Sequence, residues 1–167
     1  MRRIMIIGGP GSGKSTLALA LGARLGLPVV HIDPMYWSAG WVQRTAAQTV
    51  ALVAAAAAGP SWVFEGNHSA SYACRADRAD LIVFLDLPRL LRLVRVLRRV
   101  WHYAGQTRPD MPQGCPERLD FGFLLFTLRW ERRPALGLLD RVQGQTPTLH
   151  LKTSAQVRRF LADPAIK

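Results

Sequence analysis

The stretch that decides the fold is Gly8-Gly9-Pro10-Gly11-Ser12-Gly13-Lys14-Ser15-Thr16, which matches the phosphate-loop pattern G-x-x-x-x-G-K-[ST] in full. It follows the short apolar run Arg3–Ile7 and opens the helical pattern Lys14–Leu25, which is the strand-then-helix context that the pattern requires. Glycines let successive backbone N–H groups turn toward one point, and the start of a helix adds partial positive charge there. The stretch therefore predicts a site for nucleotide phosphates.

The residue types in this loop predict ATP and Mg²⁺ as cofactors. Lys14 is expected to reach the β- and γ-phosphates and to stabilise the charge of the departing γ-group, which makes it a candidate catalytic residue. The Ser15 hydroxyl is the expected Mg²⁺ ligand, and Thr16 the expected α-phosphate contact. The predicted cofactor-binding residues of the loop are Gly8, Gly9, Gly11, Ser12, Gly13, Lys14, Ser15 and Thr16.

Short apolar runs alternate with helical patterns along the rest of the chain. The expected strands are Arg3–Ile7, Pro28–Ile32, Trp62–Phe64, Leu81–Leu85 and Thr148–Leu151. The expected helices are Lys14–Leu25, Thr45–Ala58, Pro88–Tyr103, Leu119–Arg133 and Thr153–Leu161. This alternation predicts the α/β class, with a five-stranded parallel sheet between two layers of helices.

The length and composition favour one domain, residues 1–167, with 49% hydrophobic residues. No apolar run is long enough to span a membrane or to form a signal peptide, so we expect no membrane partner and a cytoplasmic location. The two cysteines, Cys74 and Cys115, are expected to be free thiols.

Three carboxylates follow expected strands, at the edge where open α/β sheets bind ligands. Asp33 is the candidate general base for an acceptor hydroxyl, and Glu65 the candidate that holds Mg²⁺ through a water molecule. Asp86 follows the strand Leu81–Leu85. The alternative for each is a cap on the next turn.

The formal net charge is +11, and the basic residues are almost all arginine. Arg89, Arg92, Arg95 and Arg99 share one face of the helix expected over Pro88–Tyr103, and a Pro- and Gly-rich loop, Gly105–Arg118, comes next. A loop of this length between arginine-bearing helices is typical of a lid that closes over phosphates. A solvated surface face is the alternative for Arg89 and Arg92.

The remaining side chains are less informative. His31, His68, His102 and His150 show no zinc-ligand spacing. Tyr36, Trp37 and Trp41 after Asp33 either stack on a ring or pack beneath a loop.

Several motifs together resemble the adenylate-kinase-related proteins often labelled topology modulation proteins, over nearly the whole chain. They are Gly8–Thr16, His31-Ile32-Asp33 with Trp37 and Gly40-Trp41, Glu65-Gly66-Asn67, Phe84–Arg89, Arg108–Pro112 and Gly114–Glu117. The resemblance implies a three-layer P-loop kinase fold of the nucleoside-monophosphate-kinase type, with strand order 2-3-1-4-5. It also implies an acceptor-binding region at about 33–60 and a lid at about 99–133.

The same resemblance assigns roles to arginines. Arg95 and Arg99 match lid-proximal arginines that hold ATP phosphates, and Arg132 and Arg133 match arginines that bridge the donor and acceptor phosphates. On this pattern Arg75 or Arg78 holds the acceptor. Most relatives carry Asp where this chain has Glu65.

The leading interpretation is an ATP-dependent kinase that moves the γ-phosphoryl group to a nucleoside monophosphate or a similar small acceptor. One alternative is a kinase of a hydroxylated metabolite. The other is a nucleotide-dependent regulator that binds nucleic acid through its arginine-rich face. The arginines bracket a loop instead of forming an open stripe with interleaved aromatics, so nucleic acid is the less favoured partner. The sequence does not indicate an oligomeric state.

Overall fold

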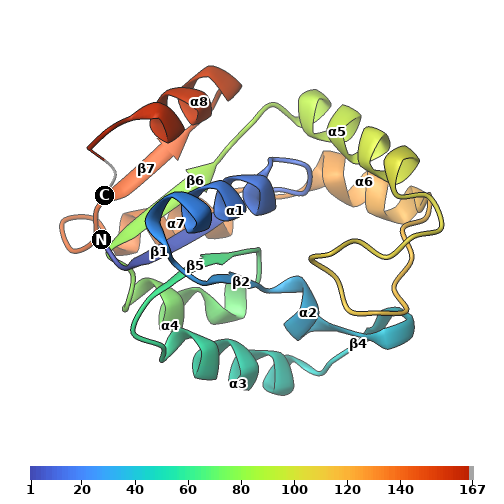
Figure 1. Ribbon diagram of the computed structural model, residues 1–167, viewed down its shortest axis with the longest axis horizontal. Coiled ribbons are helices and arrows are strands. Elements are labelled where there is room, and N and C mark those ends of the chain that lie inside the picture. Colours follow the sequence, from blue (N-terminus) through green and yellow to red (C-terminus); the bar gives the residue numbers. More distant parts are fainter. Residues whose placement is uncertain (166–167) are drawn as a thin grey trace.

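The computed structural model describes residues 1–165, and its centre is a parallel sheet of five strands (Figure 1). The strands are β1 (Arg3–Gly8), β2 (Val29–His31), β5 (Trp62–Glu65), β6 (Leu81–Leu85) and β7 (Thr148–Leu151). They lie in the order β2-β5-β1-β6-β7. Counted among themselves along the chain, this is 2-3-1-4-5, so the predicted fold class and strand order are confirmed. The phosphate loop thus leaves the middle strand of the sheet.

Helices cover both faces of the sheet, as a parallel sheet requires. They are α1 (Lys14–Leu25), α2 (Asp33–Tyr36), α3 (Ala46–Ala57), α4 (Tyr72–Ala76), α5 (Arg89–His102), α6 (Phe121–Arg129), α7 (Arg133–Arg141) and α8 (Ser154–Ala162). Two 3₁₀ turns, Ala39–Trp41 and Ser69–Ser71, and a small hairpin of β3 (Trp37–Ser38) and β4 (Val42–Gln43) complete the described elements.

Alternate side chains of β1 enter two separate cores, because successive residues of a strand point to opposite faces. Met5 and Ile7 pack in one core with residues of α3, α4 and α7. Ile4 and Ile6 pack in the other with residues of α1 and α8. The strand is therefore apolar on both faces. Because it is packed on both faces, the start of the phosphate loop that follows it is firmly positioned.

Several expected element ends are confirmed by their caps. Gly26 ends α1 in the left-handed conformation, with φ of 64°. Thr45 begins α3 through a capping box with Gln48, and Thr153 begins α8 in the same way with Gln156.

The helix expected over Leu119–Arg133 is present but shorter, and a second helix that was not expected follows it. α6 ends at Arg129, and Pro134 lies in the first turn of α7. In a continuous helix Pro134 would lack the hydrogen bond to the Trp130 carbonyl and clash with it. In a first turn the missing N–H has no consequence, so the chain restarts its helix there.

Helix α5 presents its arginine face to the protein and an apolar stripe to solvent. Arg92 is 5% exposed, whereas Trp101 is 85% exposed. Leu90, Val94 and Leu97 recur at helical spacing along the same exposed stripe. A position on a solvated surface face, the alternative for both arginines, is thus wrong for Arg92. It is correct for Arg89, which is exposed.

The loop predicted as a lid is the segment 103–120 between α5 and α6, called the α5–α6 segment below. It lies against the β3–β4 hairpin, where Gly40 donates its backbone N–H to the Gly114 carbonyl at 3.0 Å. The Trp41 indole donates to the Pro116 carbonyl at 3.1 Å. Figure 1 shows the two regions meeting beyond the ends of the strands. Cys115, from the same segment, and Cys74 are both free thiols, as expected.

No helix within residues 1–165 is long and apolar enough to span a membrane.

Candidate active site

A cavity of 1510 Å³ lies at the carboxyl edge of the sheet. Its wall includes Lys14 at the start of α1, Asp33 just beyond β2, and Glu65 at the end of β5. Because β2, β5 and β1 are parallel neighbours, their carboxyl ends meet at this edge. The structure thus brings together three candidate residues that lie far apart in sequence.

The phosphate loop depends on glycine at two positions. Gly11 has φ of 72°, and a Cβ there would lie 2.3 Å from the Arg92 carbonyl oxygen. Gly13 precedes α1 with φ of 91°, which leaves the first N–H groups of the helix free to face the cavity. Lys14 donates from Nζ to the Gly9 carbonyl at 3.2 Å, so the side chain lies back along the loop.

Asn67 fixes the start of the loop from the neighbouring strand. Its Oδ1 accepts from the Gly8 backbone N–H at 3.2 Å, and its Nδ2 donates to the Gly8 carbonyl. The Tyr72 hydroxyl donates to the same Oδ1 at 3.2 Å. A side-chain amide can pair with both backbone groups of one residue, which a carboxylate cannot do. The motif Glu65-Gly66-Asn67 thus couples a candidate metal residue to a loop-positioning residue.

Glu65 is 3% exposed and is held by two donors. The Ser15 hydroxyl donates to Oε1 at 3.0 Å, and Nδ1 of His31 lies 2.7 Å from the same oxygen. Burial opposes the charged carboxylate, but the His31 bond, the nearby Lys14 charge and the Ser15 bond outweigh it, so the pKa of Glu65 is lowered. The hydrogen bond to Glu65 raises the pKa of His31 in turn.

Asp33 lines the cavity from the first turn of α2, and 47% of its side chain is exposed. The cavity walls remove bulk solvent around it, and the Glu65 carboxylate repels its charge, so the pKa of Asp33 is raised. Burial lowers the pKa of Lys14, although Glu65 and Asp33 act in the opposite direction. A carboxylate with a raised pKa beside a cationic phosphate-binding group is the combination that a proton acceptor needs.

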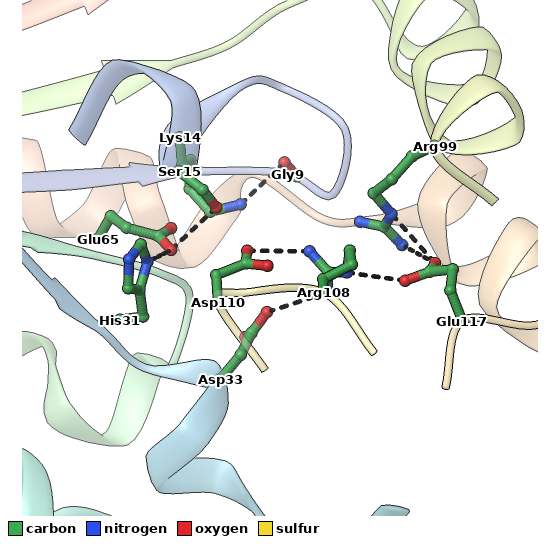
Figure 2. A network of polar contacts seen from close by, with 10 residues as sticks. All are labelled: Gly9, Lys14, Ser15, His31, Asp33, Glu65, Arg99, Arg108, Asp110 and Glu117. Atoms are coloured by element: carbon green, nitrogen blue, oxygen red, sulfur yellow. Dashed lines mark hydrogen bonds and ion pairs between the residues drawn. The ribbon is translucent and has the colours of Figure 1, made fainter. Parts of the chain in front are cut away.

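Arg108 lies beside three carboxylates, two from its own α5–α6 segment and one, Asp33, from just beyond β2 (Figure 2). Its Nη1 donates to Asp110 at 2.9 Å, its Nε lies 2.7 Å from Oε2 of Glu117, and its Nη2 lies 4.0 Å from Asp33. Its side chain is 10% exposed. Glu117 also accepts from Arg99, whose Nη2 lies 2.7 Å away. The guanidinium therefore joins the segment to the end of β2.

Arg95 and Arg99, the predicted ATP-phosphate contacts, both line the cavity. Arg95 donates from Nη1 to the Ser12 carbonyl at 3.3 Å and from Nη2 to the Ser154 hydroxyl at 3.0 Å. Arg95 thus lies directly beside the phosphate loop, while Arg99 lies beside the α5–α6 segment.

Other arginines named from the sequence lie elsewhere. The Arg132 side chain is 64% exposed and pairs with Asp86 at 3.2 Å. Neither Arg132 nor Arg133 is part of the cavity wall, whereas Arg129 lines it. Arg132 lies in the break between α6 and α7, and Arg133 is the first residue of α7, so neither belongs to the helix that carries Arg129.

Arg75, the suggested acceptor contact, is fully buried between the rings of Phe64 and Tyr72 and donates to the Gly66 carbonyl. Arg78 donates to the Ala58 carbonyl and does not line the cavity. Neither arginine therefore lines the cavity.

Aromatic side chains form the cavity wall next to Asp33. Tyr36 meets Trp37 edge to face at 5.0 Å between ring centroids, and Trp37 meets Trp41 at 5.4 Å. His68 lies 6.1 Å from Tyr36 and also faces the cavity. The rings pack on one another and also line the cavity, so stacking on the ring of a bound molecule stays a prediction.

The loop fits the phosphates of ATP, and the Ser15 region fits Mg²⁺. The Ser12 hydroxyl is buried and has no partner among residues 1–165, so the loop retains a free polar group for a phosphate oxygen. Ser15 and Glu65 supply the hydroxyl and carboxylate oxygens that Mg²⁺ prefers.

No protein-family model matches this chain, and no curated protein matches it. Solved structures do resemble it. Shikimate kinase from Acinetobacter baumannii, in complex with shikimate, has a TM-score of 0.62 at 16% identity, covering 96% of this chain and 89% of that chain. Shikimate kinase from Bacteroides thetaiotaomicron has a TM-score of 0.54 at 16% identity, covering 96% and 94%. A gluconokinase from Sinorhizobium meliloti has a TM-score of 0.51 at 17% identity, covering 96% and 93%. These likenesses define the fold as that of the P-loop kinases, and they do not extend to the topology modulation type.

Sequence reasoning gave no role to His31, Asp110 or Glu117. All three lie in motifs that carry the resemblance, namely His31-Ile32-Asp33, Arg108–Pro112 and Gly114–Glu117. For Asp110 and Glu117, a further signal was the presence of charged residues inside a Pro- and Gly-rich loop. His31 gave no spacing signal, because its partners come from distant elements.

Proposed function

We propose that this protein is an ATP-dependent kinase that transfers the γ-phosphoryl group to a hydroxyl group of a small molecule. The observation that carries the proposal is the position of the Asp33 carboxylate in the same cavity as Lys14, at the carboxyl edge of the sheet. A phosphate-binding lysine and an accessible carboxylate in one cavity provide both functions that transfer to a hydroxyl requires.

In the proposed reaction the acceptor oxygen attacks the γ-phosphorus, the bond from that phosphorus to the β-phosphate oxygen breaks, and ADP leaves. The hydroxyl proton passes to the Asp33 carboxylate. Lys14 and Arg95 stabilise the negative charge on the transferring group and on the leaving phosphate. Mg²⁺, when bound, neutralises phosphate charge and orients the oxygens. Ser15 would ligate it directly and Glu65 through a water molecule.

The wall beyond Asp33 favours an acceptor that carries a ring or several hydroxyls. Tyr36, Trp37 and Trp41 offer apolar faces, and His68 offers a polar edge. The shikimate kinases and the gluconokinase that share the fold are named for hydroxylated acids.

A nucleoside monophosphate is the alternative acceptor, which the family resemblance implies. The arginines expected to hold its phosphate, Arg75 and Arg78, do not line the cavity. Arg108 does line it, but three carboxylates already surround its guanidinium. This arrangement favours a hydroxylated acceptor over a nucleotide. The regulator alternative is weaker still, because Arg92, Arg99 and Arg108 all turn inward.

The cytoplasm is the proposed location, since it supplies ATP and keeps thiols such as Cys74 and Cys115 reduced.

The test is phosphoryl transfer from Mg·ATP, followed by ³¹P NMR, to a panel of cyclic hydroxy acids, sugar acids, polyols and nucleoside monophosphates. We expect a hydroxylated compound to give a phosphate ester, with Lys14→Ala and Asp33→Asn each reducing kcat by about 10²–10⁴-fold. The matched controls Lys152→Ala and Asp140→Asn, both exposed and outside the cavity wall, should keep full activity. Transfer only to nucleoside monophosphates would overturn the hydroxyl acceptor, and binding of ATP with transfer to no compound would overturn the kinase.

A further inference from the structure

Three side chains from three separate elements converge beside the phosphate loop. His31 ends β2, Glu65 ends β5, and Asp110 belongs to the α5–α6 segment. One ligand atom of each, an imidazole nitrogen or a carboxylate oxygen, lies within 4.8 Å of the others. Figure 2 shows the three side chains on the side of the cavity where Ser15 and Lys14 lie. Small side-chain movements would bring all three onto a single ion.

Each of the three groups is shielded and held in orientation. The exposed fractions of the side chains are 16% for His31, 3% for Glu65 and 14% for Asp110. Glu65 accepts from Ser15, and Asp110 accepts from Arg108. Metal-ligating carboxylates are commonly oriented by such hydrogen bonds, which reduce the ordering that binding requires.

The ligand set suits a divalent cation. Two of the three groups, Glu65 and Asp110, are carboxylates, and together they offset the charge of one divalent ion. Nδ1 of His31 faces Glu65 at 2.7 Å, so a metal ion bound there would take the place of a proton between nitrogen and carboxylate.

We propose that His31, Glu65 and Asp110 bind a divalent transition-metal ion in the absence of nucleotide, and that this ion fastens the α5–α6 segment to the edge of the sheet. An imidazole with two carboxylates suits Mn²⁺, Co²⁺ or Zn²⁺, whereas Mg²⁺ favours oxygen ligands alone. The site shares Glu65 with the function proposed above, but there Mg²⁺ comes with ATP and needs neither His31 nor Asp110.

The ion would connect parts of the chain that Arg108 and the hairpin contacts also join. His31 and Glu65 belong to the rigid sheet, and Asp110 belongs to the segment that covers the cavity. By linkage, an ion that bridges these parts stabilises the closed position of the segment by the free energy of its contact with Asp110.

The experiment uses the full chain without nucleotide. Co²⁺ is titrated and followed by visible absorption, and Mn²⁺ by electron paramagnetic resonance of the free ion. We expect one equivalent of each to bind, more tightly than Mg²⁺ in competition. His31→Ala and Asp110→Asn should each weaken binding at least tenfold. The matched controls His102→Ala and Asp140→Asn, both exposed, should bind as the unaltered protein does.

Hydrogen exchange gives a second readout. Metal should slow exchange in the α5–α6 segment of the unaltered protein and leave it unchanged in Asp110→Asn. If His31→Ala does not fold, Asp110→Asn is the decisive variant. Asp110 lies in a segment outside the two cores, so its replacement should leave the fold intact. Equal affinity of the unaltered protein and Asp110→Asn, or no preference over Mg²⁺, would overturn the inference. Neither result depends on phosphoryl transfer, so the two proposals fail separately.

Discussion

Ser15 and Glu65, fifty positions apart, are joined by a hydrogen bond of 3.0 Å from the serine hydroxyl to Oε1 of the glutamate. This bond connects the first turn of α1 to the end of β5 across the centre of the sheet. It orients the one hydroxyl that the loop offers to a cation toward a buried carboxylate. The proposed Mg²⁺ site is therefore already arranged before ATP binds.

Glu65→Gln should preserve the shape of this site and remove its charge. The amide oxygen can still accept from Ser15, but it holds an Mg²⁺-bound water less strongly. We expect kcat to fall by about 10²-fold, a typical effect of losing one electrostatic contact in a catalytic site. ADP release measured at saturating Mg·ATP checks this, with Asp140→Asn as the matched control. Unchanged kcat would remove Glu65 from the proposed mechanism.

Gly11→Ala should impair nucleotide binding, whereas Gly137→Ala should not. At residue 11 the φ of 72° strains an alanine, and its Cβ would lie 2.3 Å from a backbone oxygen, so the loop must shift. Gly137 lies within α7 with nothing within 4 Å of an added Cβ, so alanine there should stabilise the fold by about 0.5–1 kcal/mol. Calorimetric titration with ATP and denaturant unfolding of both variants measure the two effects. Normal ATP affinity in Gly11→Ala would contradict the proposed loop geometry.

Arg108→Ala should destabilise the protein far more than Arg141→Ala. Removing Arg108 leaves Glu117, which is 5% exposed, without one of its two cationic partners and Asp110 without its own. Breaking a buried ion pair from one side costs about 3–5 kcal/mol. Arg141 pairs with Asp77 at the surface, where both side chains are largely exposed, and its loss should change stability by less than about 1 kcal/mol. Urea unfolding measures the loss of stability in each variant. An equal loss in Arg108→Ala and Arg141→Ala would show that the ion pairs of Arg108 do not support the fold.

Asp80 should make the free energy of unfolding depend on pH in the acidic range. Burial opposes its charge, but bonds from the Arg2 and Arg3 backbone N–H groups, at 2.7 and 2.9 Å, outweigh that, so the pKa of Asp80 is lowered on folding. A lowered pKa gives stability that is complete above the unfolded pKa of about 3.9 and disappears as pH falls through the folded value. The difference in unfolding free energy between the unaltered protein and Asp80→Asn should therefore be constant near neutral pH and shrink below about pH 4. A difference that persists at pH 2 would show that charge is not its origin.

The sequence predicted the sheet, its carboxylates and the phosphate loop because each has a local signal. Strands such as Leu81–Leu85 are continuous apolar runs, whereas their order was implied by the family resemblance that several motifs carry. Asp33 and Glu65 could be placed in one site because parallel strands end at the same edge.

The remainder depended on tertiary contacts. The break before Pro134 moved Arg132 and Arg133 out of the site, although helical periodicity runs through that region. The inward position of Arg92 and the role of Arg108 were equally hidden, because they follow from how helices and a loop dock on the sheet and not from the pattern of their own segments.

Helix α5 also has a practical consequence for handling the protein. Because Arg92 and Arg95 face the phosphate loop, the opposite stripe of Leu90, Val94 and Leu97 is exposed and belongs to neither core. Polar replacements along that stripe should raise solubility while leaving the folded protein and its cavity intact, which makes α5 the first helix to redesign for concentrated samples.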